Sequence, residues 1–222
     1  MSSVRLGLPA QRGELRDRRE DGHHLHHLVW RLGPGVRVCS SAVLGGGIGP
    51  RAWILNAQVP GGYPRLDPDR HLAEIAAAEG LTGPGAGLMT AADVAAYTTA
   101  RDSGVTATVT AGLGVRGWAA APDGDRAPAF QPGTVNIVVT LPAALSDAAL
   151  VNAVATATEA KVQALLAAGL DCSGTPTDAV CVAAPEPGPD GGEPFAGPRS
   201  TWGARIARAV HGAVLDGASP AA

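Results

Sequence analysis

The chain has 222 residues, of which 45% are hydrophobic and 4% aromatic, and its formal net charge is −3. This length suffices for one sizeable core, which Ala, Val, Leu and Ile must fill because aromatic side chains are scarce. The weakly acidic balance argues against nucleic-acid binding, which needs a basic face to neutralise phosphates. No apolar run of about 18 residues suggests a membrane span, and the charged first twenty residues lack the apolar segment of a secretory signal. We therefore expect a cytoplasmic protein.

Residues 1–27 are predicted to form a flexible N-terminal extension that can be removed with little effect. Residues 16–21 are all charged and offer no apolar face. Four histidines within residues 23–27 are typical of a metal-binding tract, but a terminal tail supplies no fixed geometry. We expect no metal there. The folded domain is predicted over residues 28–217, followed by a tail at 218–222.

The first elements expected in the domain are β-strands. Residues 28–32 and 36–39 are β-prone runs on either side of a Gly-Pro-Gly turn, which predicts a hairpin. Residues 53–55 predict a third strand. The three cysteines are odd in number and lack CxxC spacing, so each is interpreted as a small buried hydrophobic residue.

Two helices are expected next. Residues 66–79 predict the first, with Asp67 as N-cap, Pro68 at the first helical position and Gly80 at the end. Residues 91–97 predict a short second helix.

The second half of the chain predicts three strands and two longer helices. Residues 105–111 alternate strictly, with threonines on one face, and residues 134–141 and 177–183 predict further strands. A long helix is predicted over 146–168, and its apolar stripe is expected to consist of Leu150, Val151, Val154, Val162, Leu165 and Leu166. A final amphipathic helix is predicted by Trp202, Ile206, Val210 and Val214. This order favours an α+β fold, a layered sheet covered by helices in a single domain, with α/β as the alternative.

A loop rich in serine and glycine follows the second strand. Ser40 and Ser41 precede three glycines, of which Gly46 and Gly47 are the last two. Such a loop can bring backbone N–H groups against a ligand, or it can form a tight turn. It does not match GxGxxG, which argues against a dinucleotide site.

Several polar residues are hard to explain as scaffold. Asn136 lies inside an apolar strand, where it either braces a loop or touches a substrate. Asp178 begins a late strand, as a turn cap or as a functional carboxylate. Lys161 is the only lysine among seventeen basic residues, and it either extends to solvent or meets a carboxylate. Glu159 lies two positions earlier, so it cannot pair with Lys161 along the helix.

Ordered blocks of the sequence resemble the adenosylcobinamide amidohydrolase family. They cover about residues 36–214, and each alone is weak, whereas the ordered set is fairly specific. The blocks are residues 40–43, 87–92, 110–114, 132–137, 158–161 with 164–165, 174–179 and 195–198. Two positions depart from the family pattern as we expect it: Gly45 where an Asn is expected, and Pro176 where a small flexible residue is expected.

The resemblance implies hydrolysis of the amide that joins aminopropanol, or its phosphate, to the corrin side chain. The product would be adenosylcobyric acid, which re-enters cobalamin synthesis. The corrinoid is then the substrate and partner, no cofactor is predicted, and association into a homo-oligomer is left open.

Amide hydrolysis needs an activated nucleophile, a carbonyl polariser and an acid for the amine. Neither a GxSxG elbow nor an HExxH motif is present. His71, in the first turn of its predicted helix, is a weaker catalytic candidate. The predicted catalytic residues are Glu159, Lys161, Asp178 and Asn136, converging between the long helix and the late strands. The predicted substrate-binding residues are Ser40, Ser41, Gly46, Gly47, Thr90, Thr134, Thr175 and Thr177.

Two other functions are compatible with these patterns. A non-catalytic corrinoid-binding protein would share the ligand face and lack an acid–base pair. A self-processing hydrolase with an N-terminal Thr nucleophile would be cleaved before Thr134 or Thr175, each of which follows a glycine.

Overall fold

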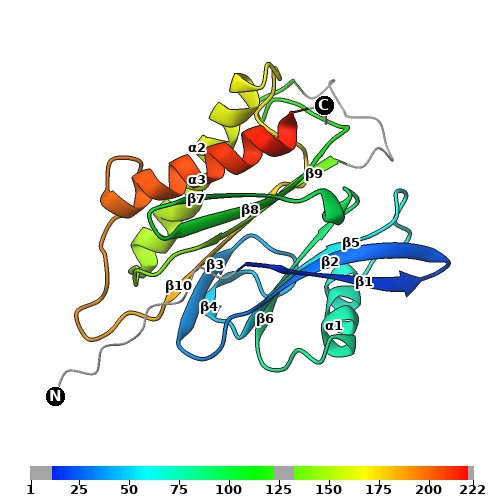
Figure 1. Cartoon of the computed structure of the whole chain (residues 1–222), viewed down its shortest axis with the longest axis horizontal. Helices are drawn as coiled ribbons and strands as arrows, with labels where there is room; N and C mark the ends of the chain where they lie inside the picture. The colour runs from blue at the N-terminus through cyan, green and yellow to red at the C-terminus, as the bar shows by residue number, and fades with distance from the viewer. Residues whose placement is uncertain (1–11, 123–132, 220–222) are drawn as a thin grey trace.

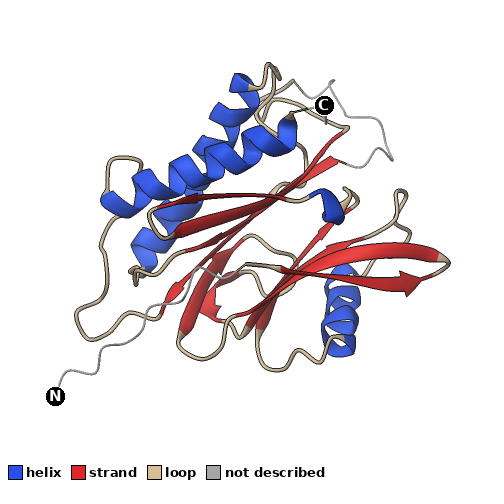
Figure 2. Ribbon diagram, in the orientation of Figure 1, coloured by secondary structure: helices blue, strands red, loops and turns tan. Residues whose placement is uncertain are grey.

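The computed structural model describes residues 12–122 and 133–219 and stacks them in four layers, helix, sheet, sheet and helix (Figure 1). Helices α2 (Asp147–Ala167) and α3 (Thr201–Ala218) cover the outer face of a six-stranded sheet. A four-stranded sheet packs on its inner face, and α1 (Pro68–Ala78) covers the far side (Figure 2). The layered α+β prediction is confirmed.

The four-stranded sheet has the order β1-β2-β5-β6. Strands β1 and β2 form an antiparallel pair, β5 is antiparallel to β2, and β6 runs parallel to β5. Helix α1 makes the crossover between the two parallel strands. The bounds are β1 Glu14–Glu20, β2 His23–Arg31, β5 Trp53–Gln58 and β6 Gly85–Thr90.

The six-stranded sheet has the order β4-β3-β10-β9-β8-β7. Only β9 and β10 are parallel, and α2 makes the crossover between them. The bounds are β3 Val36–Ser40, β4 Gly47–Pro50, β7 Thr98–Asp102, β8 Val105–Leu113, β9 Gly133–Thr140 and β10 Ala179–Pro185.

Three apolar layers hold the stack together. Strands β8 and β9 direct their aliphatic side chains, such as Val109 and Ile137, toward α2 and α3. The layer between the sheets is built around Trp30, Leu88 and Val138. On β8 the opposite face carries Thr106, Thr108 and Thr110, which are also buried because they point into the space between the sheets. This central layer is therefore partly polar.

The predicted hairpin between residues 28–32 and 36–39 is wrong, although both strands exist. Gly33 and Gly35, both with φ of +75°, turn the chain from one sheet into the other. Strand β2 pairs with β1 and β5, whereas β3 pairs with β4 and β10. Both strands bury their apolar side chains in the layer between the sheets, and that requirement outweighs the local turn signal.

The predicted flexible extension is also wrong from residue 12 onward, and residues 1–11 lie outside the described ranges. Asp21 and Gly22, with φ of +47° and +80°, form a tight turn between β1 and β2. Strand β1 is a charged edge strand, and backbone pairing rather than an apolar face holds it. The histidines of residues 23–27 belong to β2, where His27 is fully buried.

The long helix is confirmed, but its buried face is rotated from the predicted stripe. Val151 and Leu166 are 56% and 47% exposed. The buried residues are mostly small: Ala149, Leu150, Ala153, Thr156, Ala157, Ala160, Lys161, Ala164 and Leu165. Small side chains let α3 approach closely.

The remaining local predictions are confirmed in part. Ser146 caps α2 through its side chain, whereas Asp67 precedes α1 with its carboxylate bound to Arg65 instead of the helix. Residues 91–97 contain only a short 3₁₀ turn, Val94–Ala96. Cys172 and Cys181 are buried and Cys39 is half-buried, all as free thiols. No helix in the described part of the chain is long and apolar enough to cross a membrane.

Candidate active site

A cavity of about 760 Å³ opens between the two sheets. One wall comes from the end of β6 and the loop after β5, which contributes Tyr63. The opposite wall comes from β9 and from the turn before β10, which contributes Asp178. Its size falls in the range of small-molecule sites. Segments far apart in the sequence therefore build one pocket.

Asp178 is the charged centre of the turn before β10. Its Oδ2 forms an ion pair with Lys161 Nζ of α2, and both side chains are nearly buried. Its Oδ1 accepts hydrogen bonds from the Val135 backbone N–H at 2.8 Å and from the Thr175 hydroxyl at 2.5 Å, while the Thr175 backbone N–H donates to Oδ2 at 3.1 Å. Lys161 therefore meets a carboxylate, one of the two outcomes that the sequence left open. Four donors therefore fix the position of the Asp178 carboxyl group at the cavity wall.

Asn136 reaches the same cavity from β9. Its Nδ2 donates to Asn56 Oδ1 at 2.8 Å and to the Met89 carbonyl at 3.1 Å, which fixes the orientation of the amide. Asn56 is itself held by a hydrogen bond to Thr110. The Asn136 Oδ1 is buried and has no partner within the described ranges. Asn136 thus braces the two sheets and keeps one acceptor unused beside the cavity.

Four side-chain hydroxyl groups also line the pocket. Ser41 and Thr90 each accept a backbone N–H, from Val180 and Ala92 respectively, so each keeps its own proton available for donation. Thr134 of β9 and Thr177 of the turn before β10 hydrogen-bond to each other at 2.6 Å. These four predicted substrate-binding residues all line the cavity.

Other predicted site residues lie outside the cavity lining. Glu159 is on the exposed face of α2, because two residues turn a helix by about 200° and so direct it away from Lys161. Ser40 is buried and bonds to backbone groups of Val180 and Ala42. Gly46 lies in the turn between β3 and β4, and Gly47 begins β4. Arg51 binds the carbonyls of residues 45 and 46 in this turn. Thr175 contacts the pocket only through Asp178.

The two departures from the expected family pattern have structural consequences. Gly45 has φ of +64°, and an added Cβ would lie 1.9 Å from the Gly85 carbonyl oxygen, so no side chain fits in this turn. Pro176 lines the cavity between Thr175 and Thr177. It stiffens the turn that carries Asp178.

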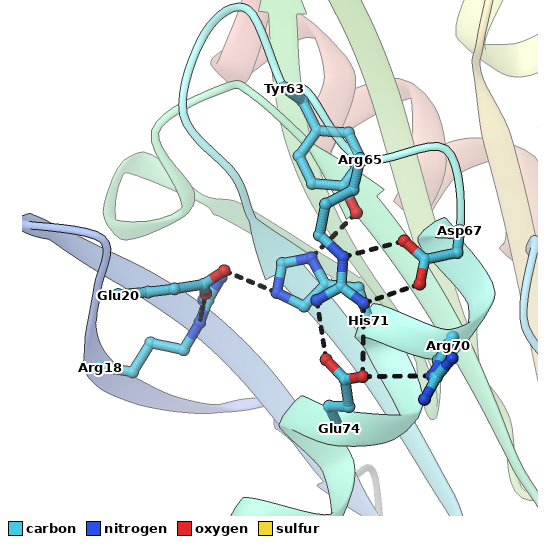
Figure 3. Close-up of polar contacts among 8 residues, drawn as sticks. All are labelled: Arg18, Glu20, Tyr63, Arg65, Asp67, Arg70, His71 and Glu74. Carbon is cyan, nitrogen blue, oxygen red and sulfur yellow. Dashed lines mark hydrogen bonds and ion pairs between the residues drawn. The ribbon is translucent and has the colours of Figure 1, made fainter.

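Sequence reasoning omitted a second polar group at the cavity, formed by Tyr63, His71 and Glu20 (Figure 3). The Tyr63 hydroxyl lies 2.9 Å from His71 Nδ1, and His71 Nε2 lies 2.7 Å from Glu20 Oε1. Burial raises the pKa of Tyr63. His71 had been noted, but Glu20 lay in the presumed extension, so the connection between them could not be drawn. Over the residues that the structure places, no cluster of three or more His, Cys, Asp or Glu is arranged for a metal ion.

Comparison with known proteins matches residues 11–221 to the family model described as adenosylcobinamide amidohydrolase. The chain belongs to this family. An adenosylcobinamide amidohydrolase of Methanosarcina mazei is 36% identical over 179 residues, which is 77% of this chain and 84% of that protein. One of Halobacterium salinarum is 46% identical over 106 residues, which is 45% of this chain and 43% of that protein. The family match begins just before β1 and so includes the strand that carries Glu20.

Proposed function

We propose that this protein hydrolyses adenosylcobinamide to adenosylcobyric acid and aminopropanol, in salvage of cobalamin precursors. The family match supports the substrate. The site is proposed because the Asp178 side chain lines a cavity and forms an ion pair with Lys161, the only lysine of the chain. The corrinoid serves as substrate and not as a resident cofactor. Three free cysteines are consistent with the reducing cytoplasm.

Asp178 is the proposed base. Of its four donors, two are backbone N–H groups and one is Lys161, and all three are fixed by the fold. The Thr175 hydroxyl can rotate away, so a water molecule in the cavity can take its place on Oδ1. Asp178 then accepts a proton from this water as its oxygen attacks the amide carbon. Lys161 acts through Asp178, because it holds the carboxylate in position and balances its charge.

The carbonyl polariser is assigned to the hydroxyls of Ser41 and Thr90. Lys161 and Asn136, two of the predicted catalytic residues, are the other candidates for this role. However, the Asn136 N–H groups are both used within the protein, and Lys161 is directed to Asp178. Ser41 and Thr90 each have a proton free to donate to a developing oxyanion. The unused Asn136 Oδ1 is suited to accept a hydrogen bond from an amide N–H of the substrate.

The direct test is incubation of the purified protein with adenosylcobinamide, followed by chromatography of the corrinoids and detection of aminopropanol. We expect conversion to adenosylcobyric acid. Tight binding without product would favour the non-catalytic corrinoid-binding alternative, and unchanged substrate with folded protein would contradict the proposal.

Variants of the charged pair test the assigned chemistry. We expect Asp178→Asn and Lys161→Met to lower kcat by at least about a hundredfold, the size of effect seen when such groups are lost. Glu159→Gln is the matched control, because this residue is exposed on the same helix and should retain near wild-type turnover. Circular dichroism checks that each variant is folded. Near wild-type turnover of both Asp178→Asn and Lys161→Met would remove this pair from the mechanism.

The self-processing alternative makes a separate prediction. Cleavage before Thr134 or Thr175 would divide the chain, whereas hydrolysis through Asp178 requires no cleavage. Intact mass spectrometry of the active protein is expected to give a single species near 22.2 kDa.

A further inference from the structure

The group of Tyr63, His71 and Glu20 forms a continuous chain of polar contacts from the cavity to the outer strand of the four-stranded sheet (Figure 3). Tyr63 lies in the loop after β5 and lines the cavity, His71 lies in the first turns of α1, and Glu20 ends β1. Arg18 donates to the other oxygen of Glu20 at 2.9 Å. The loop after β5 and strand β1 thus each place one polar side chain against the His71 ring of α1.

The burial of His71 is costly for a purely structural residue. Its side chain is only 4% exposed, and both ring nitrogens contact polar partners. An apolar side chain would fill this position without the cost of removing an imidazole and a carboxylate from water. Tyr63 also stacks on the ring, with the two planes within 7° of each other. The arrangement fixes the direction of each ring nitrogen.

We propose, resting on the function proposed above, that Tyr63 is the acid that protonates the departing amine, and that His71 and Glu20 are its positioning residues. The cationic imidazole donates Nε2–H to Glu20 and Nδ1–H to the phenol oxygen. The Tyr63 proton is then free to point into the cavity. This assigns the third group that amide hydrolysis needs, on the opposite wall from Asp178.

The proposed proton transfers need no reactant other than the substrate and water. Water attack forms the new C–O bond and leaves one proton on Asp178. As the C–N bond breaks, the nitrogen takes the Tyr63 proton, and the phenol oxygen recovers a proton from His71 Nδ1. His71 is reprotonated as Asp178 releases the proton from water to solvent. The net reaction consumes one water and yields one carboxylic acid and one amine.

Burial keeps the phenol of Tyr63 protonated, because it is the largest cause of the raised pKa of Tyr63. Among the nearby charges, Arg65 has the largest effect and lowers this pKa, whereas the carboxylates of Asp67, Glu20 and Glu74 raise it. Arg65 is bound to Asp67 and Glu74. Arg70 lies beyond Glu74, with its Nε 3.5 Å from that carboxylate.

The first experiment separates proton donation from packing. Tyr63→Phe keeps the ring and removes the hydroxyl, and we expect kcat for adenosylcobinamide to fall by about 10²–10⁴ with KM changed less than about threefold. With a corrinoid amide of trifluoroethylamine, a less basic leaving group, the deficit should shrink by at least about tenfold. Tyr97→Phe is the control, because Tyr97 is the other tyrosine and lies outside this cavity.

The second experiment tests the positioning residues through the leaving group. Glu20→Gln removes the charged partner of His71 Nε2, so kcat for adenosylcobinamide should fall by at least about tenfold with KM little changed, and this deficit should shrink with the trifluoroethylamine substrate. Glu14→Gln, which removes an exposed carboxylate of the same strand, should leave turnover unchanged. If wild-type protein turns over adenosylcobinamide and Tyr63→Phe is equally fast, or if the Glu20→Gln deficit is the same for both substrates, this proposal is overturned alone. An inactive wild-type protein overturns the proposed function, and this proposal with it.

Discussion

The ion pair between Lys161 and Asp178 leaves no room for a side chain at Gly174. Its φ is +150°, and an added Cβ would lie 2.1 Å from Asp178 Oδ2 and 2.5 Å from Lys161 Nζ. The close approach of Lys161 and Asp178 therefore depends on the absence of a side chain at this position. Its carbonyl also accepts a hydrogen bond from the Gly117 backbone N–H at 3.0 Å, which ties the turn to the loop after β8.

We predict that Gly174→Ala lowers kcat by at least about tenfold, because its methyl group must displace Asp178 or Lys161, and a misplaced catalytic group commonly has effects of that size or more. Gly188→Ala is the matched control, since that glycine has open space around it and no positive φ. Steady-state kinetics of both variants checks the prediction. Unchanged turnover in Gly174→Ala would mean that the pair need not be held in this geometry.

At this scale the sequence anticipated one contact of the candidate site. Lys161 and Asp178 were selected because a charged side chain near an apolar helix face needs a partner, and the two do form an ion pair. Glu159 was selected with them and lies on the exposed face. The error came from assigning the buried face by its largest side chains, whereas alanines form it. Tyr63 was missed because a lone tyrosine in a loop carries no spacing signal.

Among the elements, β1 was the hardest to predict. Six of its seven residues are charged, and β-prone apolar alternation, the usual strand signal, is absent. The Asp21-Gly22 dipeptide was the available clue, because it favours a two-residue hairpin turn. Edge strands need only one partner and little burial, so composition alone identifies them poorly.

The pairing of β1 with β2 leads us to predict that residues 1–27 are needed, contrary to the expectation from the sequence. Their removal deletes β1, shortens β2 and eliminates Glu20, so we predict a melting temperature lower by about 10 °C or more and kcat reduced at least about tenfold. A truncation that ends before residue 12 leaves both strands intact and is the control. Calorimetry and turnover measurements check both proteins. A 1–27 deletion with wild-type stability would show that the hairpin contributes little.

At the scale of the whole molecule, a fully buried histidine makes the free energy of unfolding depend on pH. His27 of β2 has no exposed surface, and burial lowers its pKa. Its Nε2 lies 2.9 Å from Glu79 Oε1, but the ring is not angled for a hydrogen bond, so this carboxylate offsets the burial only in part. Folding therefore favours the neutral ring.

We predict that the free energy of unfolding falls as pH drops below about 6.5, where the unfolded chain takes up a proton that folded His27 resists. The stabilisation is fully present above that pH and is lost as pH falls toward the lowered pKa of the folded state. His27→Gln should flatten this dependence, whereas His23→Gln, at an exposed position, should not. Urea unfolding at pH 7.5 and 5.5 measures it. If the free energy of unfolding changed equally between these two pH values in wild type and His27→Gln, His27 would not be the source of the pH dependence.

The pairing of β3 with β10 can form only late in the synthesis of the chain, because β10 lies near its C-terminal end. The Ser40 hydroxyl binds the Val180 carbonyl, 140 residues later in the chain. At roughly 5–20 residues per second, a ribosome takes about 7–28 s to make that interval. Throughout this time the nascent β3 has β4 on one side and an open edge on the other. The wall that carries Asp178 is also absent until then, so substrate cannot assist the early stages of folding. Newly made chains of this protein should therefore depend on chaperones during translation more than its size would suggest.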